Sequence, residues 1–110
     1  MNVRNKVTLI GNLGSEPEIK TFEGNKKMAR VSIATNETYK NKDGERKTET
    51  TWHTLVAWGS LVTILEKLTH KGSKVAIEGK LVNNSYLDKE GIKRYSTEVQ
   101  LNNLVLLGNS

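Results

Sequence analysis

Hydrophobic and polar residues alternate along much of this chain, which is the pattern of half-buried β-strands. The alternation predicts strands over residues 7–13, 28–35, 52–58, 75–81 and 95–107. Turn residues around Pro17 and Gly24 leave room for a further short strand from about Glu18 to Phe22. The sequence therefore predicts a mostly β protein.

One segment has the periodicity of a helix instead. Its apolar residues fall at i, i+3, i+4 and i+7, at Leu61, Ile64, Leu65 and Leu68. Ser60 is predicted to cap the start of this helix and Gly72 to follow its end. The helix separates the third principal strand from the fourth.

Residues 36–51 are polar and centre on the turn signal Asp43-Gly44. They predict a long hairpin with a mobile tip. Its eight charges sum to zero, because it contains four basic residues (Lys40, Lys42, Arg46 and Lys47) and four acidic ones (Glu37, Asp43, Glu45 and Glu49). The hairpin is therefore not a basic arm.

The order of elements predicts an all-β, five-stranded Greek-key barrel with one α-helix between strands 3 and 4. This is the layout of the OB-fold, which binds oligonucleotides or oligosaccharides on one face. A small β-sandwich with an incidental helix is the competing fold. With 110 residues and no internal repeat or linker, we expect a single domain over residues 1–110.

Composition narrows the possible partners. The net charge of +5 and a pI near 9.5 favour a polyanion. The absence of cysteine excludes a disulfide scaffold and fits a reducing compartment. Since the sequence has neither a signal peptide nor an apolar run long enough to cross a bilayer, we expect a cytoplasmic protein without membrane contact.

Motifs for catalysis or cofactors are missing from the sequence. His53 and His70 have no cysteine or spaced histidine to complete a metal site. Residues 11–14, Gly-Asn-Leu-Gly, lack the third glycine of a dinucleotide fingerprint, and we expect these glycines to let the strand bend. No P-loop or Gly-x-Ser-x-Gly elbow occurs. We expect no metal, no cofactor and no enzymatic activity.

The aromatic residues offer the candidate binding chemistry. Trp52 and Trp58 have the same parity on one predicted strand, so they share a face and lie roughly 20 Å apart. Tyr39 and Tyr86 stand in polar surroundings where burial is hard to arrange. For any single ring a place in the core is the plainer interpretation. Four rings from three elements, without a basic recognition helix, favour single strands over duplex.

Several ordered blocks of the chain resemble the bacterial single-stranded DNA-binding protein family. These blocks are residues 5–7, 11–14, 16–18, 52–59, 71–73, 77–79 and 94–99, which read Asn-Lys-Val, Gly-Asn-Leu-Gly, Glu-Pro-Glu, Trp-His-Thr-Leu-Val-Ala-Trp-Gly, Lys-Gly-Ser, Ile-Glu-Gly and Arg-Tyr-Ser-Thr-Glu-Val. The resemblance covers essentially the whole chain.

The resemblance implies an OB domain, a homotetramer and four DNA-stacking positions, at Tyr39, Trp52, Trp58 and Tyr86. It implies phosphate contacts from Lys6, Lys71 and Arg94, to which charge and location add Arg4 and Lys80. It also places His53 near subunit contacts, although a hydrogen bond within the strand is an equal alternative.

Three departures from the family pattern stand out. Tyr39 and Tyr86 stand where tryptophan is better known, and residues 83–85 (Asn-Asn-Ser) and Ser60 replace common basic residues. These changes predict weaker binding with a different salt dependence. The sequence ends at Ser110 without the acidic tail that recruits repair and replication proteins, so it gives no support to such recruitment. A trimmed chain and a naturally short relative both fit.

The sequence thus predicts sequence-independent binding and protection of single-stranded DNA in replication, recombination and repair, in the nucleoid-containing cytoplasm. An OB domain for RNA or a replication-restart accessory subunit is the alternative within binding modules. An oligomerisation or adaptor domain, with its aromatics in a protein interface, is the alternative from another class.

Overall fold

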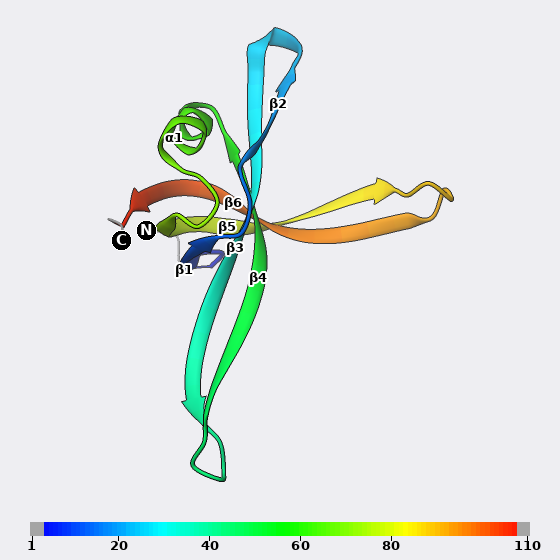
Figure 1. Cartoon of the computed structure of the whole chain (residues 1–110). Coiled ribbons are helices and arrows are strands. Elements are labelled where there is room, and N and C mark those ends of the chain that lie inside the picture. Colours follow the sequence, from blue (N-terminus) through cyan, green and yellow to red (C-terminus); the bar gives the residue numbers. More distant parts are fainter. Residues whose placement is uncertain (1–3, 108–110) are drawn as a thin grey trace.

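The computed structural model describes residues 4–107 and consists mainly of strands. In chain order the elements are β1 (Val7–Leu13), β2 (Glu18–Phe22), a 3-10 turn (Glu23–Asn25), β3 (Lys26–Lys40), β4 (Arg46–Trp58), α1 (Ser60–Leu68), β5 (Lys74–Leu87) and β6 (Lys93–Leu106). Figure 1 shows these strands crossing at the centre of the molecule, with α1 beside the crossing.

The strands form one sheet in the order β1-β5-β6-β4-β3-β2, and β1 also pairs with β3. This last pairing closes a five-stranded barrel of β1, β5, β6, β4 and β3, with β2 added beside β3. The neighbours are antiparallel except for β4 and β6. The predicted five-stranded barrel with one helix is confirmed, and the helix lies between β4 and β5 because the short β2 counts as a strand of its own.

The core lies inside the barrel and under α1. Alternate residues of the strands fill it, and Leu55, Ile33 and Ile77 are among the most deeply buried. Val62 and Leu65 of α1 join this cluster. Because the odd positions of β4 point inward, the even positions of its barrel segment, from Trp52 to Trp58, face outward.

Glycine allows the barrel to close. A side chain at Gly11 would overlap the backbone carbonyl of Ala34, where β1 crosses onto β3 through the pair Asn12 and Ala34. Gly11 thus allows a close approach between two backbones, where the sequence predicts only a bend.

One prediction about local structure needs correction. The helix cap is Gly59, which has a φ of 67° and makes no side-chain capping bond, and Ser60 is already the first helical residue. The long hairpin predicted over residues 36–51 is confirmed, with Asn36 opposite Thr50 and Lys40 opposite Arg46. Both sides of this ladder face solvent, so the turn signal predicts it and hydrophobic alternation does not.

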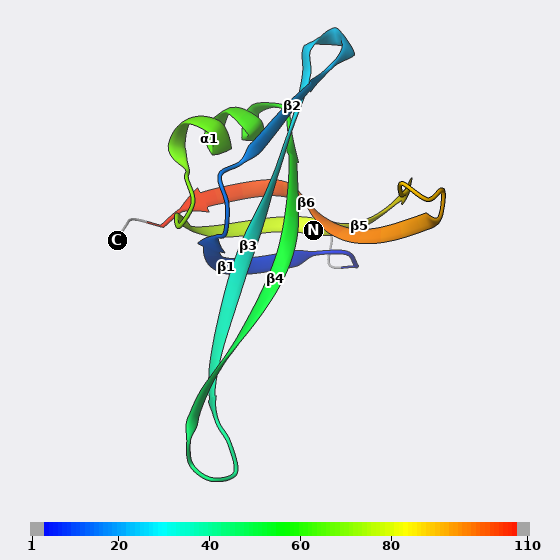
Figure 2. The same ribbon diagram turned by 45° about the vertical axis from the view of Figure 1, so that its right-hand side comes forward.

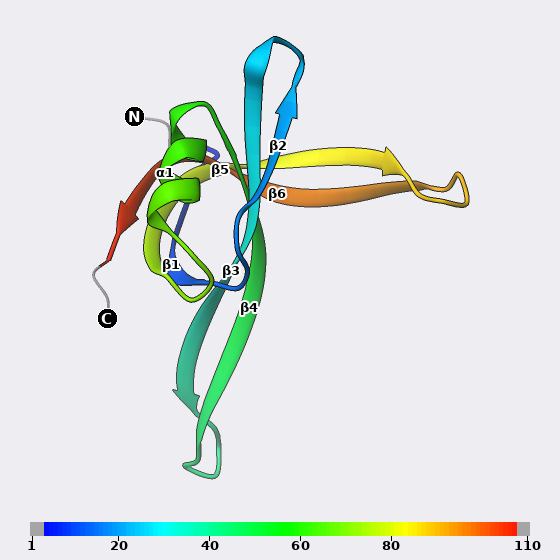
Figure 3. The same ribbon diagram turned by 45° about the horizontal axis from the view of Figure 1, so that its top comes forward.

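Besides the shorter β2–β3 hairpin, two long hairpin arms extend beyond the barrel, as Figures 2 and 3 show. The first is the outer part of β3 and β4, and the second is the outer part of β5 and β6. In the part of each arm far from the barrel, only two strands pair and nearly all side chains are exposed. The arms are therefore held by their own ladders and turns.

Candidate nucleic-acid interface

The two tryptophans lie on the outward face of residues 52–58 of β4, which is called the wall below. Trp52 is 61% exposed and Trp58 is 42% exposed, so neither ring belongs to the core. They lie at opposite ends of one outward face, with Thr54 and Val56 between them. The interpretation of these rings as core residues is therefore excluded by their exposure.

Trp52 lies against the loop that follows β1. A side chain at Gly14 would overlap the six-membered ring of Trp52 and would also come within 2.8 Å of the Ser32 hydroxyl. A glycine at this position thus leaves room for the indole to rest on the backbone. The indole thus lies beside the loop backbone, and the rest of the ring is open to solvent.

Trp58 lies against Phe22, which the sequence analysis did not assign to the site. The two ring centroids are 5.8 Å apart and the rings are tilted by 32°. Phe22 is the last residue of β2, and its role could not be inferred from the chain because only the β2–β3–β4 pairing brings it to Trp58. This pair gives the outward face a second exposed aromatic surface.

The two tyrosines lie on the arms. Tyr86 on β5 is opposite Arg94 on β6, and it shares its strand face with Glu98, which contacts the outward face of β3. Tyr39 is opposite Lys47 and five residues beyond Ala34, the partner of Trp52, so it is about 17 Å further along the arm. Alternate residues of a strand point to opposite faces, so Tyr39 lies on the same face of β3 as Ile33. Trp52 lies on the other face, together with its partner Ala34. The structure brings Tyr86 to the tryptophan side and leaves Tyr39 apart.

The predicted basic residues are spread over the molecule. Lys71 lies in the turn after α1, where its backbone N–H donates to the Glu16 carboxylate at 2.7 Å. Glu16 and Gly14 belong to the loop that follows β1, and Gly14 contacts Trp52. Lys71 therefore lies at the Trp52 end of the wall. Lys80 is exposed on the same face of β5 as Tyr86.

The remaining basic candidates differ in surroundings. Lys6 lies before β1 and pairs with Glu78 of β5 at 3.1 Å. Arg4 is exposed near the same end of the chain. Arg94 lies beside Tyr86, and its Nε donates to Asp88 at 2.9 Å.

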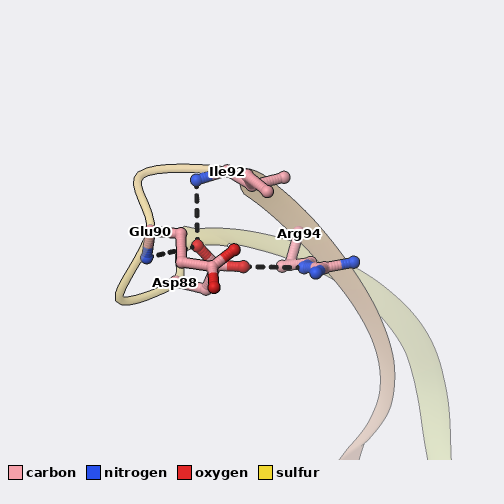
Figure 4. Close-up of polar contacts among 4 residues, drawn as sticks. All are labelled: Asp88, Glu90, Ile92 and Arg94. Carbon is pink, nitrogen blue, oxygen red and sulfur yellow. Dashed lines mark hydrogen bonds and ion pairs between the residues drawn. The ribbon is translucent and has the colours of Figure 1, made fainter.

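The tips of both arms are built in the same way. Asn41 Oδ1 accepts the backbone N–H groups of Asp43 and Glu45, and Asp88 Oδ1 accepts those of Glu90 and Ile92, each at 2.9 Å. The difference is the second oxygen of Asp88, which binds Arg94 (Figure 4). The Ile92 N–H, the Arg94 guanidinium and the Glu90 N–H hold the pKa of the Asp88 carboxyl below its ordinary value.

His53 is half-buried on β4. Its Nε2 is 3.5 Å from the Thr35 hydroxyl. It lines a groove together with Thr8 and Ile10 of β1 and Thr51 of β4. Beside this groove, residues 7–11 of β1 pair only with β5, so one edge of this strand is open.

Two other features are absent from residues 4–107, a metal-binding cluster and a membrane-spanning helix. No three His, Asp or Glu side chains in this range come together to hold a metal ion. No helix in the same range is long and apolar enough to cross a membrane.

The barrel and its outward aromatic face are typical of a class of protein, the OB-fold domains that bind single-stranded nucleic acid by stacking. The sequence matches the Single-strand binding protein family over residues 4–107. The chain belongs to this family, whose members are binding proteins and not enzymes.

Named relatives agree with this assignment. The chain is 41% identical over 105 residues to Single-stranded DNA-binding protein 1 of Xylella fastidiosa, covering 94% of this chain and 77% of the relative. It is 46% identical over 111 residues to the single-stranded DNA-binding protein of Rickettsia typhi, covering 96% and 73%. A solved complex of Plasmodium falciparum SSB with ssDNA superposes with a TM-score of 0.86 at 33% identity, covering 98% of this chain and all of that one.

Proposed function

We propose that this chain binds single-stranded DNA by stacking bases on Trp52, Trp58 and Tyr86 while Lys71 and Arg94 contact the phosphates. The observation that carries the proposal is the pair of exposed tryptophans on one outward face of the barrel wall. Unpaired bases stack on such rings at about 1–3 kcal/mol each, and base pairing hides these faces in a duplex. Binding therefore protects single strands and keeps them unpaired during replication, recombination and repair.

Tryptophan fluorescence tests this proposal directly, because both indoles are on the proposed surface. Titration with oligothymidine at low salt is expected to quench the emission, and a hairpin duplex of equal length is expected to leave it largely unchanged. Equal binding to duplex, or no quenching by oligothymidine, would contradict the proposal. A ribose oligomer of the same sequence tests the alternative of an RNA-binding domain.

We also propose that the protein works as a homotetramer in the cytoplasm, in contact with the nucleoid. Support comes from the open edge of β1 and from apolar side chains that face outward on the barrel. Ile10 on β1 is 57% exposed and Val105 on β6 is 53% exposed, and both pair with Ala76 of β5, so they form one outward apolar patch. His53 lines the groove beside this edge and belongs to the same proposed contact.

Sedimentation equilibrium without DNA measures the assembly. A species of four chains is expected, and Ile10→Lys is expected to shift it to smaller species with the barrel still folded. A monomer at micromolar concentration would contradict the tetramer and leave the binding proposal in place.

A further inference from the structure

A groove on the outward face contains a buried charge that stacking does not require. Its volume is about 550 Å³, and it is lined by Arg30, Asn84, Ser85, Tyr86, Ser96 and Glu98. Glu98 is only 6% exposed. One of its oxygens binds Arg30 Nη2 at 3.0 Å and the other accepts a hydrogen bond from the Asn84 amide.

The Arg30–Glu98 pair spans β4 between the two tryptophans. Arg30 on β3 is opposite Val56, and the other side of Val56 pairs with Gln100 of β6, two residues from Glu98. Val56 faces outward and yet is 6% exposed, as expected if the ion pair lies over it. The guanidinium is thus placed along the line from one stacking surface to the other.

Stability alone gives a weak reason for this arrangement, because a buried ion pair adds little over well-packed apolar side chains. Among residues 4–107, Arg30 bonds only to Glu98, and its buried Nε has no partner. The side chain is 40% exposed, so several N–H groups remain for a ligand. Glu98 fixes the direction in which these donors point.

We propose that the Arg30–Glu98 groove is a base-reading subsite that favours guanine and cytosine within the bound strand. A guanidinium offers adjacent donors and suits a base edge with two adjacent acceptors, which are O6 and N7 in guanine and N3 and O2 in cytosine. Adenine and thymine alternate donors with acceptors along their edges. The Ser85 and Ser96 hydroxyls line the same groove and accept amino N–H groups of the preferred bases.

The inference rests on the proposed DNA binding and adds a base preference to sequence-tolerant stacking. The test uses oligothymidines of one length in which every fourth base is replaced by guanine, cytosine or adenine. At one salt concentration, the guanine and cytosine oligomers are expected to bind at least about fivefold more tightly than the adenine oligomer. Plain oligothymidine serves as the reference for binding itself.

Two variants locate the source of the preference. Arg30→Lys keeps the charge and loses the planar fork, so it is expected to bring the affinity ratio within about twofold while still binding oligothymidine. The charge-neutral double change Arg30→Met with Glu98→Gln is expected to do the same. Arg46→Lys on the first arm, outside the groove, is the matched control and should retain the wild-type ratio.

The outcomes separate this inference from the proposed function. A wild-type ratio within about twofold, or a ratio that persists in both Arg30 variants, overturns the base-reading subsite and leaves single-strand binding intact. Failure of the wild-type chain to bind oligothymidine overturns both proposals.

Discussion

The barrel wall and the two arms present aromatic rings in different ways. On the wall, Trp52 rests on the Gly14 loop and Trp58 rests on Phe22, so both rings have fixed neighbours. Tyr39 and Tyr86 project from two-stranded ladders beyond the barrel. A base that stacks on an arm must also order the arm, which costs conformational entropy. We therefore expect the wall to contribute most of the stacking free energy and the arms to contribute reach.

The largest expected effect is the loss of a wall ring. Trp52→Ala and Trp58→Ala should each cost on the order of 1–3 kcal/mol of binding to oligothymidine, since each removes one stacking surface. Isothermal titration at fixed salt measures the loss. Tyr95→Ala is the control, because Tyr95 is exposed on the opposite face of β6 from Arg94 and is expected to change little. Unfolding of the tryptophan variants, or an unchanged affinity in folded variants, would contradict the stacking role.

Phe22 tests whether support beneath a ring matters. Phe22→Leu keeps an apolar side chain and removes the contact between the two rings, at an expected cost of about 0.5–1.5 kcal/mol in binding. In a Trp58→Ala background the same change should cost almost nothing. Additive losses in this double-mutant cycle would show that Phe22 acts independently of Trp58.

The positive charge at the Trp52 end of the wall is expected to affect the salt dependence of DNA binding. Lys71→Gln should lower the slope of log affinity against log salt by about 0.7, which is the value for one phosphate contact on a single strand. Lys67→Gln on α1, outside the proposed surface, is the control. Equal salt slopes for the Lys71 and Lys67 variants would show that Lys71 does not contact a phosphate.

The smallest expected effect concerns the two arm tips. The tip of the first arm is held by the neutral amide of Asn41, and that of the second by the carboxylate of Asp88, which also binds Arg94. Because the pKa of Asp88 is lowered in the fold, its stabilising contacts are complete above the ordinary carboxyl pKa and are lost as pH falls through the lowered value. The Ile92 amide resonance should therefore titrate at a pH below the ordinary pKa of an aspartate carboxyl. Glu45, whose amide binds the neutral Asn41, and Asp88→Asn provide the controls. A pH-independent Ile92 amide in the unmodified chain would contradict this account.

Much of the fold follows from hydrophobic alternation, because five strands each bury one face in the barrel. The outer arms could not be bounded in this way, since residues 36–40 and 46–51 expose both faces. The paired character of the tips depends on Asn41 and Asp88 binding backbone N–H groups, which the turn composition only suggests.

The binding surface was predictable only in part. The parity of Trp52 and Trp58 reveals their shared face, but nothing in the chain indicates that Phe22 reaches Trp58. Arg30 and Glu98 are distant in sequence and meet only because β3 and β6 flank β4. Such contacts depend on strand order, which a single sequence leaves open.

One comparison of affinities tests whether the wall carries most of the stacking free energy. The double variants Trp52→Ala/Trp58→Ala and Tyr39→Ala/Tyr86→Ala each lose two rings and no charge. Their affinities for the same oligothymidine at the same salt concentration are to be measured side by side. We predict a clearly greater loss for the tryptophan pair, and an equal or greater loss for the tyrosine pair would contradict the account.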